Sequence, residues 1–137
     1  MYLLDTNVVS ELRKGARADA GVRSFFASRD SSELFLPVQV VGELRAGAVR
    51  TRNRGDALQA DRLDLWLDAV TQEYTRQILD FDLECAQLWG WLMGNGPDSP
   101  IDKQVAAIAY CYGLTVVTRN QQHFNHPNLQ TLNPFLG

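Results

Sequence analysis

The chain has 137 residues, of which 45% are hydrophobic and 21% are charged, and its formal net charge is −3. This length is enough for one hydrophobic core but hardly for two, so we expect a single domain over residues 1–137. The composition argues against a disordered chain, and no apolar run reaches the roughly 20 residues that span a bilayer. The negative charge argues against a protein that holds nucleic acid by its overall charge.

Apolar periodicity and helix-breaking residues predict strands that alternate with helices along the chain. In chain order we predict a strand over 2–5, helices over 7–14 and 18–29, a strand over 34–37, helices over 38–51 and 57–74, a strand over 78–81, helices over 82–94 and 100–112, a strand over 114–118, a helical turn near 120–124 and an extended piece around 129–132. This alternation indicates an α/β fold with a mainly parallel sheet between two layers of helices. The first strand and strand 114–118 can then be neighbours.

The cytoplasm is the expected location of this protein, because a strand that begins at Tyr2 leaves no room for a signal peptide. Cys85 and Cys111 each lie inside a helical apolar pattern and form no C-x-x-C pair. We therefore expect two small buried side chains in a reducing compartment, not a disulfide or a metal site. Trp91 falls off the main apolar face of its helix, so it could stack a base or lie in a subunit interface.

Asp5 directly follows the first predicted strand and precedes Thr6 and Asn7, where a helix is expected to start. A carboxylate at the carboxyl end of a buried strand points into the crevice where open α/β sheets bind ligands. Asp5 could instead cap the following helix, but Thr6 or Asn7 could equally serve as the cap. We therefore interpret Asp5 as a functional residue.

Glu43 lies one turn into predicted helix 38–51 and is in helical register with Gly47, Arg50 and Arg54. A carboxylate at one end of this stripe could bind a metal ion, and Arg50 and Arg54 are candidate contacts to a nucleic-acid backbone. The same face could be an ordinary solvated one, and both interpretations stay open.

Asp102 lies at the start of predicted helix 100–112, where Ser99 and Asp102 have the spacing of a capping box. Asp102 also shares a helix face with Ala106 and Ala109. These small residues would let the helix start press close to the sheet and bring Asp102 beside Asp5. Capping and a functional role are compatible.

Three carboxylates in one crevice would need a cation to stay ionised together. Two of them about 4 Å apart repel by about 1 kcal/mol in water and about 4 kcal/mol in a protein-like medium. Hard oxygen ligands without a thiolate suit Mg²⁺ or Mn²⁺ better than zinc. Such an ion can activate water and stabilise the charge that develops on a phosphodiester. The acids therefore favour a metal-dependent nuclease.

Four motifs lie in order along the chain: Leu3–Asn7, Val41–Arg45, Pro100–Asp102 and Val116–Asn120. Their order and spacing resemble those of PIN-domain ribonucleases of the VapC/FitB type, the toxins of bacterial type II toxin–antitoxin pairs. The resemblance covers essentially the whole chain. It implies a PIN-like three-layer α/β/α fold with four to five strands and a Mg²⁺- or Mn²⁺-dependent endoribonuclease. It also implies a homodimer that a cognate VapB/FitA-like antitoxin inhibits.

The resemblance also implies roles for single residues. By motif match, the acidic metal-binding set would be Asp5, Glu43 and Asp102. The pocket around them would be lined by Thr6, Thr118, Asn120 and His123.

His123 is a departure from the family pattern, because family members often carry an aspartate three residues after the position of Asn120. One carboxylate fewer leaves less negative charge for a second cation. His123 could instead contact phosphate or donate a proton, or it could simply pack beside Phe124.

Other functions remain open for such a chain. A PIN-like protein that has lost activity could act as an RNA-binding or regulatory partner, which the missing carboxylate at position 123 would favour. A phosphatase with Asp5 as nucleophile commonly needs a second acid two residues on, where this chain has Asn7. A phospho-receiver domain would need a central strand that ends in a phosphoacceptor aspartate, followed by a lysine later in the chain. This sequence does not show that pattern.

Overall fold

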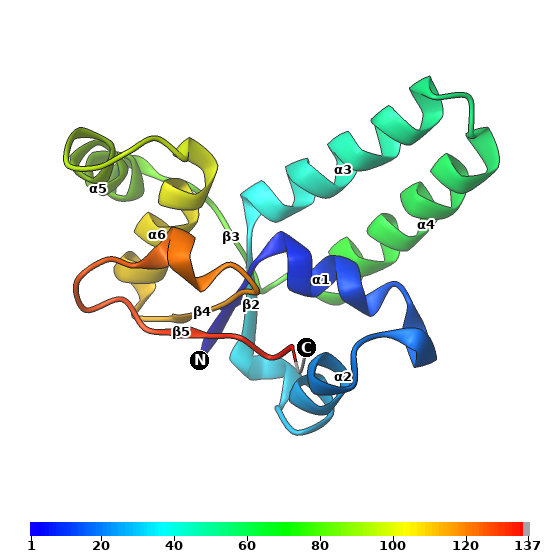
Figure 1. The fold of residues 1–137 in the computed structure, drawn as a ribbon, viewed down its shortest axis with the longest axis horizontal. Coiled ribbons are helices and arrows are strands. Elements are labelled where there is room, and N and C mark those ends of the chain that lie inside the picture. Colours follow the sequence, from blue (N-terminus) through cyan, green and yellow to red (C-terminus); the bar gives the residue numbers. More distant parts are fainter. Residues whose placement is uncertain (136–137) are drawn as a thin grey trace.

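The computed structural model describes residues 1–135 and has a five-stranded sheet in the order β3-β2-β1-β4-β5 (Figure 1). The strands are β1 Tyr2–Leu4, β2 Leu34–Pro37, β3 Ile78–Leu79, β4 Thr115–Val117 and β5 Thr131–Leu132. Every neighbouring pair is parallel. The central strand β1 lies between β2 and β4, which confirms that the first strand and the strand near residue 116 are neighbours.

Helices connect the strands, as expected for a parallel sheet. The α-helices are α1 Thr6–Leu12, α2 Ala20–Ala27, α3 Val38–Asn53, α4 Ala57–Glu73, α5 Leu83–Gly94 and α6 Pro100–Tyr112. Short 3₁₀ helices cover Gly15–Arg17, Ser31–Glu33 and Gln121–Phe124. The structure thus confirms the predicted helices within about two residues at each end, and adds the first two 3₁₀ helices.

Neighbouring residues of one strand point to opposite faces of the sheet and enter different cores. Leu3 and Val116 pack with residues of α5 and α6, whereas Leu4 and Val117 pack with residues of α1 to α4. Figure 1 shows these two groups of helices on either side of the sheet. The predicted three-layer α/β/α architecture is therefore confirmed.

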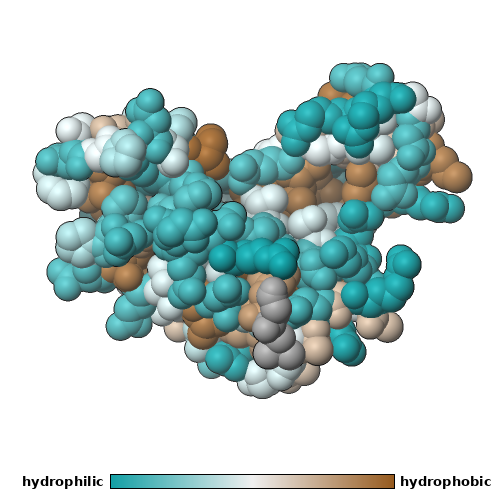
Figure 2. Space-filling view, viewed as in Figure 1, coloured by the Kyte–Doolittle hydropathy of each residue, from teal (hydrophilic) through white to brown (hydrophobic). Residues whose placement is uncertain are grey.

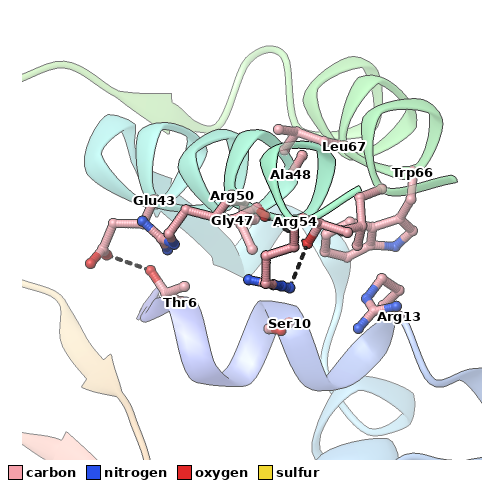
Figure 3. A pocket seen from close by; sticks show the side chains of 13 residues that line it. Thr6, Ser10, Arg13, Glu43, Gly47, Ala48, Arg50, Arg54, Trp66 and Leu67 are labelled. Carbon is pink, nitrogen blue, oxygen red and sulfur yellow. Dashed lines mark hydrogen bonds between the residues drawn. The ribbon is translucent and has the colours of Figure 1, made fainter. Parts of the chain in front are cut away.

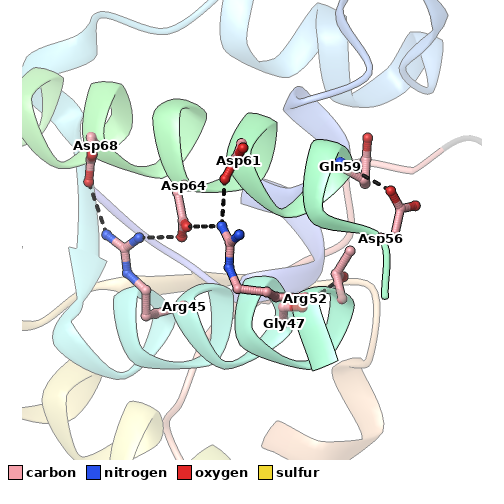
Figure 4. A network of polar contacts seen from close by, with 9 residues as sticks. Arg45, Gly47, Arg52, Asp56, Gln59, Asp61, Asp64 and Asp68 are labelled. Atoms are coloured by element: carbon pink, nitrogen blue, oxygen red, sulfur yellow. Dashed lines mark hydrogen bonds and ion pairs between the residues drawn. The ribbon is translucent and has the colours of Figure 1, made fainter. Parts of the chain in front are cut away.

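Helices α3 and α4 form an antiparallel hairpin that extends away from the sheet (Figure 1). Two arginines of α3 face the acids of α4: Arg45 binds Asp64 and Asp68, at 2.6 and 3.0 Å, and Arg52 binds Asp61 and Asp64, at 2.7 and 3.2 Å (Figure 4). These exposed pairs contribute little stability each. They show that the acids of α4 are engaged and not merely solvated, so Arg45 and Arg52 are not part of an open basic surface.

Figure 2 shows a largely hydrophilic face, with apolar residues reaching the surface between α1 and the α3–α4 hairpin. Within residues 1–135, none of the helices combines the length and the apolar character needed to cross a bilayer. Both cysteines are free thiols, and Cys85 is buried.

Candidate active site

Asp5 lies where the central strand ends and α1 begins. Its side chain is 5% exposed, and its Oδ1 accepts a hydrogen bond of 2.9 Å from the backbone N–H of Thr6. Asp5 is therefore itself the N-cap of α1, a role that the sequence left open between Asp5, Thr6 and Asn7. Capping uses only one of the two carboxylate oxygens, Oδ1.

The second oxygen of Asp5 is held by two side chains from different parts of the chain. Thr118, fully buried after β4, donates its hydroxyl to Asp5 Oδ2 at 2.8 Å. The side-chain amide of Asn7 donates to Asp5 Oδ2 and to Thr118 Oγ1, both at 3.3 Å. Thr118 also accepts the backbone N–H of Asn120 at 3.0 Å. The structure thus brings Asp5, Thr118 and Asn120 together, with Asn120 joined through its backbone.

Asn7 is a positioning residue that the sequence interpretation missed. Besides its two bonds to Asp5 and Thr118, its Oδ1 accepts the backbone N–H of Arg119 at 3.0 Å. It therefore ties the first turn of α1 to the end of β4. The sequence feature that could have identified Asn7 is its position two residues after Asp5, within the motif Leu3–Asn7.

Glu43 is exposed on α3 and accepts a hydrogen bond of 2.6 Å from the hydroxyl of Thr6 (Figure 3). Since Thr6 follows Asp5 in the chain, this bond brings the start of α3 to the start of α1. Thr6 therefore links the position of Asp5 to that of Glu43.

Asp102 occupies the first turn of α6, and its Oδ2 lies 3.0 Å from His123 Nδ1. The predicted capping box does not form: Ser99 is at the N-cap position, but with a φ of 144° and without a capping hydrogen bond from its side chain. Asp102 therefore faces His123 and not the backbone of its own helix. His123, the residue that departs from the family pattern, is therefore in direct contact with one of the three acids.

The three acids form one electrostatic group. Burial is the main cause that raises the pKa of Asp5, and the carboxylates of Asp102 and Glu43 raise that pKa further. The hydrogen bonds from Thr118 and Thr6 oppose the shift. A buried carboxylate near two others is the setting in which a bound cation would be most favourable.

The donor chemistry of the site fits a hard divalent cation. Its side chains offer carboxylate, hydroxyl and amide oxygens and no thiolate, which suits Mg²⁺ or Mn²⁺. Among residues 1–135, however, no three Asp, Glu, His or Cys side chains converge closely enough to hold one ion in their present positions. Metal binding by this set is therefore taken up below as a proposal.

A cavity of about 370 Å³ opens from Glu43 along the α3–α4 hairpin (Figure 3). Gly47, Arg50 and Arg54 line it together with Glu43, which confirms the predicted helical register of these four residues. Arg54 donates to Thr51 Oγ1 at 3.2 Å, and the opposite wall includes Arg13 of the segment after α1. The cavity therefore extends from the carboxylate of Glu43 to the guanidinium groups of Arg50 and Arg54.

Comparisons with known proteins identify the family of this chain. A family model described as "PIN domain" matches residues 2–128. The "Plasmid stability protein StbB" of Pseudomonas syringae pv. tomato is 30% identical over 142 aligned residues, which cover 98% of this chain and 99% of that protein. The "VapC ribonuclease Y4jK" of Sinorhizobium fredii is also 30% identical, over 141 aligned residues and 98% of each chain.

Two solved structures show the same fold. The crystal structure of FitAcB from Neisseria gonorrhoeae has a chain that matches with a TM-score of 0.85 and 26% identity, over 98% of both chains. The DNA-bound VapBC structure from Salmonella typhimurium matches with a TM-score of 0.73 and 25% identity, over 97% of both chains.

Proposed function

The chain belongs to the PIN domain family, and on that basis we propose that it is a metal-dependent endoribonuclease, the toxin of a toxin–antitoxin pair. The observation that carries this proposal is that Asp5, Glu43 and Asp102 come from three different helices and influence one another electrostatically, since the carboxylates of Glu43 and Asp102 raise the pKa of the buried Asp5. A relative named as a VapC ribonuclease, similar over its whole length, supports the same activity.

Asp5, Glu43 and Asp102 are the residues that would hold Mg²⁺ or Mn²⁺. Bound there, the ion would lower the pKa of a water molecule and stabilise the charge that develops on the phosphodiester. The three carboxylates must keep their positions as RNA arrives, because small displacements are costly to catalysis.

Each carboxylate is held by a different donor or contact from another part of the chain. Thr118 donates to Asp5, and Thr6 donates to Glu43. His123 contacts Asp102. We infer that these three partners are positioning residues, which set the directions of the acids before substrate binds.

Arg50 and Arg54 would contact the RNA backbone along the cavity that begins at Glu43. Because Arg45 and Arg52 already bind the acids of α4, Arg50 and Arg54 are the arginines of this hairpin best placed for phosphate. A net charge of −3 with a local basic wall is consistent with a weak grip on bulk RNA and with selective cutting.

A partner is suggested by the similar structures, which are described as FitAcB and as DNA-bound VapBC. We propose a VapB/FitA-like antitoxin for this chain and a homodimeric toxin of one domain per chain, acting in the cytoplasm.

Cleavage of a labelled single-stranded RNA pool by purified, antitoxin-free protein tests the proposal. Mg²⁺, Mn²⁺ and EDTA are compared, and Asp5→Asn serves as the inactive variant. We expect cleavage that needs metal and disappears in the variant while its circular dichroism spectrum is unchanged. A folded protein that binds the pool but cuts it with neither metal would support the alternative, an RNA-binding protein without catalysis.

A further inference from the structure

A second cavity, of about 700 Å³, lies beside the acidic group. It is formed by the end of α5, the 95–99 segment, the start of α6 and residues 122–127. His123 is part of its wall and also contacts Asp102 at 3.0 Å. His123 therefore connects this cavity to the acidic group. A nucleic-acid chain bound at the acids could place its next nucleotide in this cavity.

Lys103 is the unusual residue of this wall. It is 4% exposed, and within residues 1–135 its ammonium group has neither a hydrogen bond nor an ion pair. Asp98, the carboxylate in the same wall, is not among its partners. The stem of Lys103 is buried while the side chain lines the cavity, so an unpaired cation at this wall is suited to an anion from outside the chain.

His126 provides a second unpartnered group in the same wall. Its Nε2 atom is buried and has no hydrogen bond within the described residues. Burial lowers the pKa of His126, and the charge of Lys103 lowers it further, so the ring is neutral at neutral pH. A neutral imidazole can donate or accept a hydrogen bond, so the hydrogen-bonding capacity of Nε2 is unmet within the described residues.

The remaining walls suit a nucleic-acid base. The side-chain amides of Asn95, Gln122 and Asn125 offer both donors and acceptors, and Trp91, 59% exposed, offers a flat apolar ring. Single-stranded RNA is typically recognised by stacking on such rings and by hydrogen bonds to base edges. The volume is within the range of pockets that hold small ligands such as one nucleotide.

We propose that this cavity binds one unpaired nucleotide of the RNA substrate next to the scissile phosphate, with Lys103 on its phosphate and Trp91 against its base. The position relative to the scissile phosphate rests on the proposed nuclease function. Binding of the nucleotide itself does not, because Lys103, His126 and the amides do not belong to the acidic set.

Equilibrium binding of a fluorescein-labelled pool of random single-stranded RNA, measured in EDTA so that nothing is cut, tests this site. Lys103→Met keeps the length and burial of the side chain but removes its charge. We expect it to weaken binding about tenfold, since bonds to charged groups are the strong ones. The slope of log K against log salt should fall by about 0.7, as expected for one lost phosphate contact on a single strand.

Lys14 is the only other lysine in the sequence, is exposed and pairs with Glu11 at 2.9 Å. Lys14→Met therefore makes the same chemical change outside the cavity, and it should alter neither the affinity nor the salt slope. Thermal unfolding of both variants shows whether the buried substitution preserves the fold.

Trp91→Ala gives a second readout at an exposed position, where folding is not at risk. We expect about tenfold weaker binding from lost stacking, whereas Leu65→Ala, at a residue 71% exposed on α4, should have no effect. Wild-type affinity in Trp91→Ala and in a folded Lys103→Met would overturn the proposed site, even if the wild-type protein cuts RNA with metal. Lys103-dependent binding without any cleavage would support the site and count against the nuclease.

Discussion

Thr118 donates a hydrogen bond of 2.8 Å to Asp5, although 113 residues separate them in the chain. Replacing Thr118 with Val keeps the shape of the side chain but removes one hydrogen-bond partner each from Asp5, Asn7 and the N–H of Asn120. We expect a loss of about 1–3 kcal/mol in the free energy of unfolding, and a lower cleavage rate because Asp5 is no longer held. Urea unfolding and initial cleavage rates measure the two effects.

Thr118→Ser is the matched control, because it retains the hydroxyl group in the same buried place. It should keep most of the activity. If Val and Ser variants were equally stable and equally active, the hydroxyl would have no positioning role.

His123 tests the departure from the family pattern. His123→Ala removes the group that lies 3.0 Å from Asp102, and we expect about a tenfold lower cleavage rate and a higher Mg²⁺ concentration for half-maximal activity. His123→Asn places an amide nitrogen near the position of Nδ1 and should restore part of both values. Metal titrations of the cleavage rate provide the measurement, and unchanged values in the alanine variant would leave His123 as a packing residue only.

Arg50 and Arg52 lie on the same helix but have different surroundings. Arg50 lines the cavity next to Glu43, whereas Arg52 binds Asp61 and Asp64 of α4. Arg50→Ala should weaken RNA binding severalfold and reduce its salt dependence, and Arg52→Ala should have a smaller effect on both. Fluorescence anisotropy at several salt concentrations distinguishes them. Equal effects would show that only total charge matters.

The two cysteines should differ in reactivity. Burial raises the pKa of the Cys85 thiol to about 12. Since the thiolate is the reactive form and burial disfavours it, Cys85 stays protonated between pH 7 and pH 9 in the folded protein. We expect iodoacetamide to modify at most one cysteine, the half-buried Cys111, in the native state and both in denaturant. Intact-mass spectrometry counts the additions, and rapid double labelling of the native protein would contradict the buried environment.

Helix α6 shows where local sequence was sufficient. It was predicted over 100–112 and is observed over Pro100–Tyr112. Pro100 favours the first helical position, and Gly113 adopts a φ of 65°, which ends the helix at low cost. The strands were predicted up to two residues too long, because an apolar pattern reports burial while strand ends depend on pairing with a neighbour.

Capping shows where local sequence was insufficient. Asp5, Thr6 and Asn7 were all plausible caps for α1, and the structure uses Asp5. Ser99 was a plausible cap for α6, and its side chain makes no capping bond. Asp, Asn, Ser and Thr have similar preferences for the N-cap position. The arrangement of the surrounding elements therefore decides which of them caps the helix.

The sequence by itself determined the order of the strands and helices, the candidate acids and the helical register of Glu43 with Arg50 and Arg54, because these depend on periodicity and on motifs within a few residues. Only the tertiary structure decided that Thr118 holds Asp5, that His123 faces Asp102 and that Lys103, 4% exposed, lines a cavity without an ion pair within the described residues. Hydrogen bonds and burial of this kind require distances of a few ångströms between segments far apart in the chain. Packing of the helices on the two faces of the sheet sets those distances.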